Sequence, residues 1–299
     1  KKPYVSIMKT IVPLKKNILF SFEIFPRIKN HPLTSIDETL TALSSLSPDF
    51  ISVTCGAGGT GSHTRTVDIA ASIQQHYNLP SVAHLPGINL SKAEVSAALT
   101  AFKKQRIHNI LALRGDRNPD IPPKNDFHYA SELISFIPAQ GGFNIMAACY
   151  PEGHIEANSL RADMEHLKEK VAAGASHLIS QLFFDNDYFY RFLEHARALN
   201  INVPIEAGIM PVTSKKQIER MVLLCGATLP RKFQRILARY EDNPEALRDA
   251  GIAFAIDQIV DLLAHDVDGI HFYTMNNPAI AKRICEAVGS LLGRQTLSA

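Results

Sequence analysis

The sequence of 299 residues has no tryptophan, few cysteines and no long apolar segment, and each absence excludes a class of protein. The four cysteines stand at positions 55, 149, 225 and 285, too far apart for the paired spacings of zinc sites or for the disulfide framework of a small secreted domain. No segment reaches the roughly 18 apolar residues of a membrane helix, and the basic start lacks the apolar run of a signal peptide. We therefore expect a cytoplasmic protein with reduced cysteines and no membrane contact.

An excess of charge of either sign is also absent, because 31 basic and 29 acidic residues leave a net charge of +2. Such a chain has no broad basic surface for a nucleic-acid backbone, so we expect no nucleic-acid partner. Hydrophobic residues make up 46% and charged residues 20%, which is typical of a globular protein with a sizeable core.

Short apolar runs alternate with longer amphipathic segments along the chain, a pattern typical of repeated strand–helix units around a parallel sheet. The predicted strands cover residues 18–25, 49–55, 81–85, 109–115, 144–150, 177–184, 204–210 and 269–275. No linker or midpoint change in composition divides the chain. The pattern therefore favours one α/β domain over residues 1–299, a single (β/α)8 TIM barrel, rather than two doubly wound halves.

Several signals mark the segments between and before the strands. Residues 1–16 are expected to be an N-terminal extension, with Met8 a candidate native start. Ser91 followed by Glu94 predicts a capping box, and Gly174 is placed to end another helix. Before the last strand we expect an extra helical segment at 231–251, followed by a long helix at 252–266.

In a barrel of this kind the reactive groups project from the C-terminal ends of the strands. The polar residues at those ends are Glu23, Thr54, His84, Asp116, Tyr150, Glu152, Gln181 and the segment 273–277. Apolar neighbours surround Glu23, so desolvation would disfavour its charged form and suit it to donate a proton; pairing with a basic core residue is an equally good interpretation. For Asp116, a turn residue that caps the next helix is favoured over a carboxylate facing a bound ring. Thr54, His84 and Gln181 taken singly are more typical of core or loop residues, and only their shared position suggests a site.

A glycine-rich segment at 56–61 fits the pattern G-x-G-x-x-G of dinucleotide-binding loops. The acidic residue that such a loop requires about 20 residues further on is missing, because none occurs between Asp68 and Glu94. We interpret the glycines as a loop that lets the backbone approach a ligand.

An ordered set of motifs runs through nearly the whole chain. They are FSFEIFP at 20–26, SVTCGAGG at 52–59, ALRGD at 112–116, YPEGH at 150–154, LKEKVAAGA at 167–175, SQLFFD at 180–185, GIMPVTS at 208–214 and HFYTMN at 271–276. Any one of them is weak, but the ordered set is highly specific. The chain thereby resembles the methylenetetrahydrofolate reductase family, in particular the bacterial flavoprotein type that consists of the catalytic barrel alone.

The resemblance implies an oxidoreductase of one-carbon metabolism and methionine biosynthesis. FAD would lie at the C-terminal mouth of the barrel, NADH or NADPH would supply hydride, and 5,10-methylenetetrahydrofolate would be reduced to 5-methyltetrahydrofolate. The nicotinamide and the folate would take turns at the flavin in a ping-pong sequence. We also expect a homo-oligomer and no metal site.

The matched motifs carry over residue roles. Glu23 would be the general acid that protonates folate nitrogen 10, and Asp116 the carboxylate near the flavin and the pterin. Gln181 and Gln217 would contact the substrate, with Thr54 and Asn277 in the same site. The implied FAD contacts are Thr54, Cys55, His84, Arg114, Gly115, Asp116, Ala130, Tyr150, His154, Ala157, Asp163, His166 and Lys170.

The chain departs from the family pattern in three respects. Asn277 stands where many members have arginine, so a charge contact to the folate is absent or comes from another residue. His166 and Glu169 stand where asparagine and arginine are familiar near the FAD diphosphate. Cys55 replaces a common tyrosine, which leaves a backbone contact there.

Two other functions stay open on the sequence alone. A barrel glycosidase could pair Glu23 with Glu152 or Glu206, although the missing tryptophan counts against it because sugar sites commonly stack on aromatic rings. A non-catalytic or partner-dependent barrel that binds flavin or folate is the other alternative. The sequence does not distinguish NADH from NADPH, since it contains no Rossmann pocket.

Overall fold

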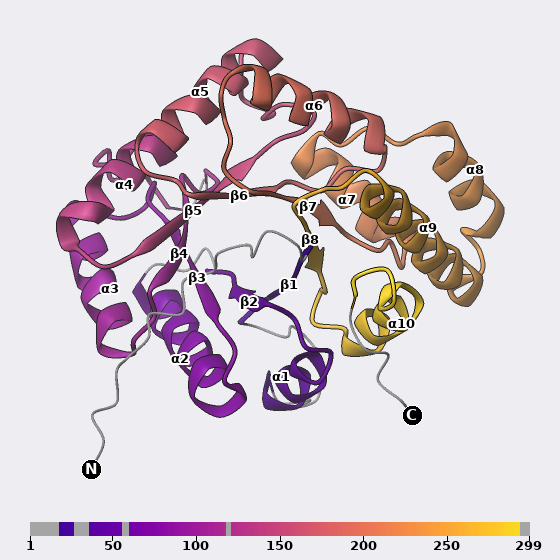
Figure 1. Cartoon of the computed structure of the whole chain (residues 1–299), viewed down its shortest axis with the longest axis horizontal. Helices are drawn as coiled ribbons and strands as arrows, with labels where there is room; N and C mark the ends of the chain where they lie inside the picture. Colours follow the sequence, from indigo (N-terminus) through magenta and orange to yellow (C-terminus); the bar gives the residue numbers. More distant parts are fainter. Residues whose placement is uncertain (1–17, 27–35, 56–59, 118–120, 294–299) are drawn as a thin grey trace.

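The computed structural model describes residues 18–26, 36–55, 60–117 and 121–293. Within these residues eight parallel strands form a closed barrel in the order of the chain, and helices surround it (Figure 1). The strands are β1 Leu19–Ile24, β2 Phe50–Val53, β3 Ser81–Pro86, β4 Asn109–Leu113, β5 Asn144–Cys149, β6 His177–Ser180, β7 Ile205–Ile209 and β8 Gly269–Tyr273. The predicted (β/α)8 barrel and each predicted strand are confirmed. The expected N-terminal extension, residues 1–16, lies outside the described residues.

Seven of the eight observed strands end one to four residues earlier than predicted. Gly115 has a φ of 89° and Met275 a φ of 51°, both outside the β region. Thr54, Tyr150 and Gln181 directly follow β2, β5 and β6 instead of belonging to them. Since the C-terminal ends of parallel strands in a closed barrel lie at one rim, these polar residues share that rim.

The outer layer consists of helices that connect consecutive strands. They are α1 Ile36–Ser44, α2 Thr60–Tyr77, α3 Lys92–Lys104, α4 Ala130–Phe136, α5 Leu160–Ala172, α6 Asn186–Ala198, α7 Lys215–Cys225, α8 Arg231–Tyr240, α9 Pro244–Ala264 and α10 Pro278–Val288, with a 3-10 turn η1 at Ile137–Gln140. The predicted capping box is confirmed, because the Glu94 backbone N–H donates to Ser91 Oγ at 3.2 Å and the Ser91 N–H donates to Glu94 Oε2 at 2.7 Å. Helix α5 ends at Ala172, just before Gly174 with its φ of 120°.

The extra helices before β8 are present, but the predicted boundary between them at Gly251 is wrong. The break falls at residues 241–243, where the Asn243 side chain accepts from the Ala246 N–H at 3.1 Å and Pro244 opens α9. Gly251 lies inside α9, and a Cβ there would overlap the carbonyl oxygen of Val212. Its glycine allows the helix to approach the loop after β7 and does not end the helix.

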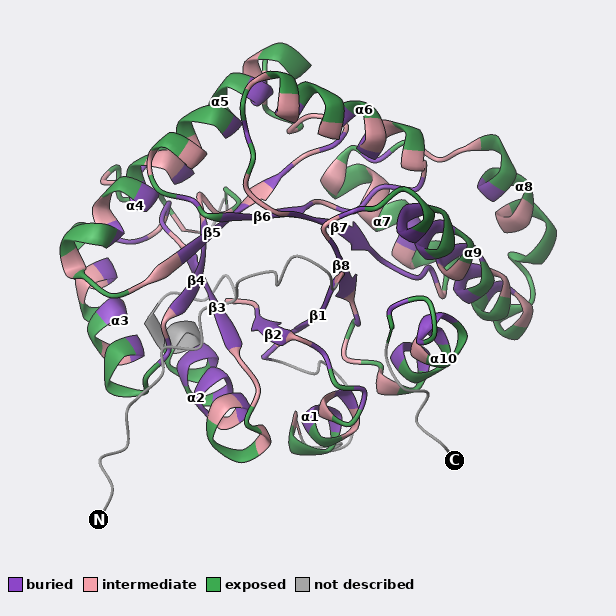
Figure 2. Ribbon diagram, viewed as in Figure 1, coloured by how far each residue is buried: buried purple, intermediate pink, exposed green. Residues whose placement is uncertain are grey.

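The core has an inner and an outer part. Between the strands and the helices lies a continuous apolar layer, so that the strands are buried and the helices expose only their outer faces (Figure 2). Inside the barrel, an apolar cluster consists of Phe50, Val82, Leu111, Met146 and Ile179. Buried polar side chains share that interior, namely Ser21, Glu23, Ser52, His84, His177, Glu206 and His271. Among the helices of the described residues, none is long and apolar enough to cross a membrane.

Candidate active site

Glu23 lies near the C-terminal end of β1, with its side chain inside the barrel and 11% exposed. Its Oε2 is 3.5 Å from His84 Nε2 on β3 and 3.6 Å from His271 Nε2 on β8. Burial lowers the pKa of His84 to about 4, with the Glu23 charge opposing this shift and His271 adding to it. The His84 ring is therefore neutral near neutral pH. Among the described residues, the ion-pair partners of Glu23 are histidines and not the arginine or lysine of a structural core pair.

The backbone around Glu23 is fixed by residues that follow β8. Thr274 Oγ1 donates to the Glu23 carbonyl oxygen at 2.7 Å. The Asn276 side chain accepts from the Phe25 N–H at 2.8 Å and donates to the Phe25 carbonyl at 2.9 Å. These bonds continue the β1–β8 ladder beyond the end of the strand, so the acid is carried on a rigid backbone.

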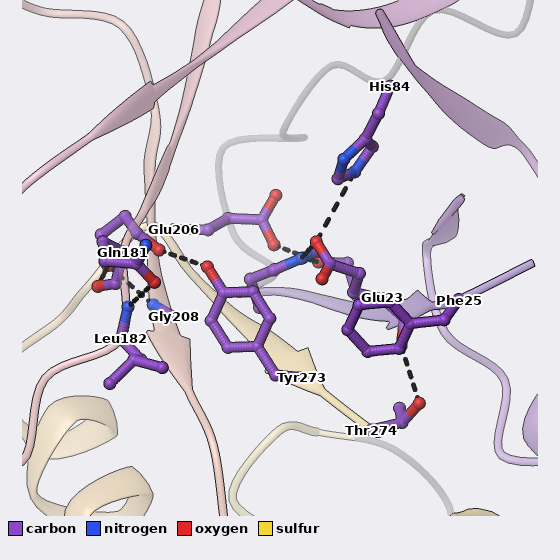
Figure 3. A network of polar contacts seen from close by, with 12 residues as sticks. Glu23, Phe25, His84, Gln181, Leu182, Glu206, Gly208, Tyr273 and Thr274 are labelled. Atoms are coloured by element: carbon purple, nitrogen blue, oxygen red, sulfur yellow. Dashed lines mark hydrogen bonds and ion pairs between the residues drawn. The ribbon is translucent and has the colours of Figure 1, made fainter. Parts of the chain in front are cut away.

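Tyr273 and Gln181 form the neighbouring part of the rim. The Tyr273 hydroxyl donates to the Ser180 carbonyl at 2.7 Å, and burial raises the pKa of Tyr273 well above its ordinary value. Gln181 is half-buried, and its Oε1 accepts from the Leu182 N–H at 2.9 Å. Figure 3 shows Tyr273 between Gln181 and Glu23. The Gln181 amide N–H groups donate no hydrogen bond within the part of the chain that the structure describes.

A cavity of about 660 Å³ lies beside this rim, between the ends of β4 and β5 and the helices α4 and α5. Eight of the residues expected to contact FAD line it: Arg114, Ala130, Tyr150, His154, Ala157, Asp163, His166 and Lys170. The remaining expected contacts, Thr54, Cys55, His84, Gly115 and Asp116, are not part of its lining. The structure thus brings most of the predicted cofactor residues together around one space.

The two cationic groups Arg114 and Lys170 in the cavity wall are held by hydrogen bonds. Arg114 donates two hydrogen bonds to the Glu156 carboxylate, both at 2.7 Å, and this pairing raises the pKa of Arg114. Lys170 Nζ donates to the Ala148 carbonyl at 2.9 Å and lies 5.3 Å from the centre of the Tyr150 ring. Burial lowers the pKa of Lys170, whereas the nearby Asp163 carboxylate opposes that shift.

Asp163 and the two unusual residues of α5 complete the wall. Asp163 Oδ2 accepts from the His154 N–H at 3.2 Å, and burial raises the pKa of Asp163. His166 stacks on Tyr129 with ring centres 6.1 Å apart, and its Nδ1 is 3.5 Å from Glu169 Oε2. The two departures from the family pattern on α5 therefore contact each other at the cavity.

The segment after β4 places Asp116 at the rim. Gly115 adopts a φ of 89°, and a Cβ there would lie 2.9 Å from Pro86 Cβ. Asp116 is exposed, and its charge contributes to raising the pKa of Tyr150, after burial and Asp163. Thr54 continues the β1–β2 ladder, with its N–H donating to the Ile24 carbonyl at 3.0 Å. The glycine loop that we predicted to approach a ligand lies mostly outside the described residues, at 56–59.

Gln217 and Asn277 make local hydrogen bonds. Gln217 Oε1 accepts from the Thr213 N–H at 2.9 Å and from Thr213 Oγ1 at 3.0 Å, which fixes the loop after β7. Asn277 caps α10, since its Oδ1 accepts from the Ile280 N–H at 3.3 Å. Their expected folate contacts stay predictions.

The two carboxylates that a glycosidase would need opposite Glu23 are engaged elsewhere. Glu152 accepts from the Thr228 N–H at 3.0 Å and 3.2 Å. Glu206 is fully buried and accepts from Ser21 Oγ at 2.5 Å, with His177 Nε2 at 2.6 Å. Neither supplies a free second acid in the mouth of the barrel.

Comparison with known proteins identifies the family. A family model described as methylenetetrahydrofolate reductase matches residues 7–289. The chain belongs to the methylenetetrahydrofolate reductase family. It is 33% identical over 284 residues to 5,10-methylenetetrahydrofolate reductase of Pectobacterium carotovorum subsp. carotovorum, covering 95% of this chain and 94% of that protein. With the Escherichia coli protein of the same name it shares 32% identity over 286 residues, 95% of each chain.

A plant relative and two solved structures extend the comparison. Methylenetetrahydrofolate reductase (NADH) 1 of Arabidopsis thaliana is 35% identical over 272 residues, 86% of this chain and 46% of the plant protein. A Clostridium thermocellum protein described as binding two copies of 5-methyl-5,6,7,8-tetrahydrofolic acid has a TM-score of 0.59 at 15% identity, covering 89% of this chain and 93% of that one. A dihydropteroate synthase of Thermus thermophilus has a TM-score of 0.50 at 9% identity, covering 93% of each chain. At these identities the structural likeness shows the barrel fold alone.

Membership in the methylenetetrahydrofolate reductase family settles the reaction. The chain is an enzyme that reduces 5,10-methylenetetrahydrofolate to 5-methyltetrahydrofolate in folate one-carbon metabolism. The family implies a folate and NAD(P)H as substrates, and its members are generally flavin-dependent. The prediction of a reductase is confirmed, and the glycosidase and non-catalytic alternatives are set aside.

Sequence reasoning missed several residues of this candidate site. Ser21 and His271 stand two positions before Glu23 and Tyr273, and the period of two along a strand places each pair on the same face, a signal that was available. Asn276 belongs to the segment 273–277 that we expected at the rim, but its two hydrogen bonds to the Phe25 backbone were not predicted. Glu156 lies in a loop, where no pattern indicated that it pairs with Arg114.

Proposed function

We propose that FAD binds in the 660 Å³ cavity beside the barrel mouth. The cavity has the size of a typical cofactor site, about 300–1,000 Å³. Small side chains at Ala112, Ala130, Ala148 and Ala157 leave room in its wall, and Tyr150 presents an aromatic ring. Arg114 and Lys170 supply cationic groups suited to a diphosphate. The residues present therefore fit a flavin dinucleotide.

FAD, when bound, supplies a carrier that takes hydride from NAD(P)H and passes it to the folate, in two half-reactions that share one site. The protein's own part is binding, orientation and the movement of one proton. Arg114 and Lys170 would hold the charged end of the cofactor. Gln181, whose amide N–H groups donate no hydrogen bond among the described residues, would orient whichever substrate occupies the mouth.

Glu23 would protonate nitrogen 10 of the folate. The electrons of the bond between the methylene carbon and nitrogen 10 then go to that nitrogen, and the five-membered ring opens to a cationic iminium at nitrogen 5. The exocyclic carbon of this iminium accepts the hydride. Asp116, exposed at the rim, would stabilise the cation electrostatically.

One observation carries the assignment of the acid. Glu23 is a buried carboxyl at the C-terminal end of β1, beside the neutral ring of His84 and on a backbone fixed from β8. General acid catalysis needs a carboxyl within hydrogen-bond reach of the substrate, and the place of Glu23 at the mouth of the barrel supports this role.

Stopped-flow measurement of the two half-reactions tests the assignment. Glu23→Gln should reduce the folate half-reaction by about 10²- to 10⁴-fold, the usual contribution of a general acid, and leave flavin reduction by NADH largely intact. Glu152→Gln is the matched control, because it changes a carboxylate near the same rim whose hydrogen bond from Thr228 the amide oxygen can keep. An equal loss in both half-reactions of Glu23→Gln would show a structural role instead.

A further inference from the structure

A continuous line of polar side chains runs from Glu23 through the barrel interior to His177. His271 Nε2 is 3.6 Å from Glu23 Oε2, and His271 Nδ1 is 2.6 Å from Ser21 Oγ. Ser21 Oγ is 2.5 Å from Glu206 Oε2, and Glu206 Oε1 is 2.6 Å from His177 Nε2. Ser21, Glu206 and His271 are fully buried, and His177 is 3% exposed. Figure 3 shows the side chain of Glu206 pointing toward Glu23 within this interior.

Glu206 sets the direction of the hydrogen bonds in this line. Burial alone would raise its pKa, but the hydrogen bond and charge of His177, together with His271 and Ser21, lower the pKa of Glu206 overall. An ionised carboxylate only accepts hydrogen bonds. His177 Nε2 must therefore donate to one oxygen and the Ser21 hydroxyl to the other.

The orientation of the Ser21 hydroxyl in turn decides whether His271 Nδ1 donates or accepts a hydrogen bond. A serine hydroxyl has one proton, and here that proton points to Glu206. Toward His271, Ser21 Oγ can then only accept, so His271 Nδ1 must carry a hydrogen. The tautomer of His271 is thus set by a carboxylate that it does not touch.

The other nitrogen of His271 faces Glu23. His271 Nε2 is buried and has no hydrogen-bond partner among the described residues, although it lies at ion-pair distance from Glu23 Oε2. In a neutral ring protonated at Nδ1, Nε2 presents a lone pair. A lone pair and an ionised carboxylate repel each other, so this contact is favourable only when one proton lies between the two atoms.

We propose that Glu206, acting through Ser21 and His271, keeps a proton on the Glu23–His271 pair and thereby maintains Glu23 as an acid. The proposal rests on the role of Glu23 proposed above. When Glu23 gives its proton to folate nitrogen 10, its carboxylate is left against the Nε2 lone pair. That arrangement favours the uptake of one proton from solvent before the next folate binds. Glu206, Ser21 and His271 are positioning residues, because they act on the substrate through Glu23.

The other titratable groups around the pair do not supply this proton. The ring of His84 is neutral, with its pKa lowered to about 4 by burial. The Tyr273 hydroxyl already donates to Ser180. Burial raises the pKa values of Cys149 and Tyr150, the two groups on β5 and its following loop that act on Tyr273.

Ser21→Ala breaks the line at its centre with the loss of one oxygen atom. His271 Nδ1 then has no acceptor, and the ring is free to carry its proton on Nε2, where it would donate to ionised Glu23. Glu23 would lose its proton at lower pH. The pH at which the rate of the folate half-reaction falls on the alkaline side should therefore be lower by about one pH unit or more. Near neutral pH this shift corresponds to about a tenfold loss of rate, and acidification should restore the rate.

Ser52→Ala is the matched control. Ser52 is the β2 register partner of Glu23, is fully buried, and its hydroxyl has no hydrogen-bond partner among the described residues. The Ser52→Ala variant loses an equally buried hydroxyl beside Glu23 but keeps the line of polar side chains intact. The pH profile of its folate half-reaction should therefore match that of the unchanged enzyme. Flavin reduction by NADH should be preserved in both variants, which also shows that they fold.

The holoenzyme itself allows a second measurement that does not depend on activity. Nitrogen-15 NMR of the histidine rings, with the His271 signals assigned by their loss in His271→Gln, should show hydrogen on Nδ1 and none on Nε2 when Glu23 holds the proton. Hydrogen on Nε2 alone, or an unmoved pH profile in Ser21→Ala, would overturn the proposal. Because Glu23→Gln tests the acid separately, a normal folate half-reaction in that variant would instead refute the proposed role of Glu23.

Discussion

Replacing Gly115 by alanine probes how strictly the turn after β4 is constrained. Gly115 has a φ of 89°, a region that alanine adopts only with strain of about 1–3 kcal/mol. The new Cβ would also lie 2.9 Å from Pro86 Cβ and 3.1 Å from Ile88 Cγ2, closer than carbon atoms normally approach. Overpacking of this kind adds about 1–3 kcal/mol. The expected loss of stability for Gly115→Ala is therefore about 2–6 kcal/mol.

Thermal unfolding measures this loss. At about 2.1 cal/mol/K per residue, the unfolding entropy converts about 2–6 kcal/mol into a fall in Tm of about 3–10 °C for a chain of this length. Gly174→Ala is the control, because Gly174 has a φ of 120° but nothing lies within 4 Å of the position that its new Cβ would take. The control carries the backbone strain without the clash, so Gly115→Ala should be lower in Tm than Gly174→Ala. Equal Tm values would refute the steric part of the reasoning.

Three further outcomes are expected. The pKa of His84 is lowered from 6.5 to about 4 on folding, so between these pH values the unfolded chain binds more protons than the folded chain. The free energy of unfolding should therefore decline by up to about 3 kcal/mol as the pH drops through this range. His84→Gln should remove this decline from a pH profile of unfolding free energies measured with denaturant. Asp116→Asn removes a negative charge near the proposed flavin, so the flavin reduction potential should rise and the folate half-reaction should slow; an unchanged potential and rate would contradict the assignment. Arg114→Lys keeps the charge but loses the two-bond pairing with Glu156, and FAD affinity measured by fluorescence titration should fall by about tenfold, whereas unchanged affinity would remove Arg114 from the cofactor site.

The features that sequence reasoning predicted well depend on neighbours along the chain. The capping box of Ser91 and Glu94 needs residues three apart, and the strands need only short apolar runs between turns. The barrel followed because the alternation of these units leaves few other topologies. Even so, the boundary at Gly251 was misplaced, because the glycine serves a contact with Val212, which is distant in sequence.

The parts that sequence reasoning could not supply depend on strand register. Glu23 was expected at the rim, but its two histidine neighbours come from β3 and β8, and nothing local to β1 indicates which side chains those strands place beside it. The pairing of Arg114 with Glu156 likewise joins two loops that follow different strands. Such contacts can be identified only when the register of the strands in the closed barrel is known.

The closure between β1 and β8 has a consequence for biosynthesis. The groups that fix Glu23 come from the other end of the chain, since the bond from Thr274 spans 251 residues. Ribosomes make about 5–20 residues per second, so the acid emerges about 12–50 s before its supports exist. During that interval the first strand has an open edge and carries an unsupported carboxylate. The surroundings of Glu23 are therefore complete only after the last strand of the barrel, β8, and the segment that follows it have been made.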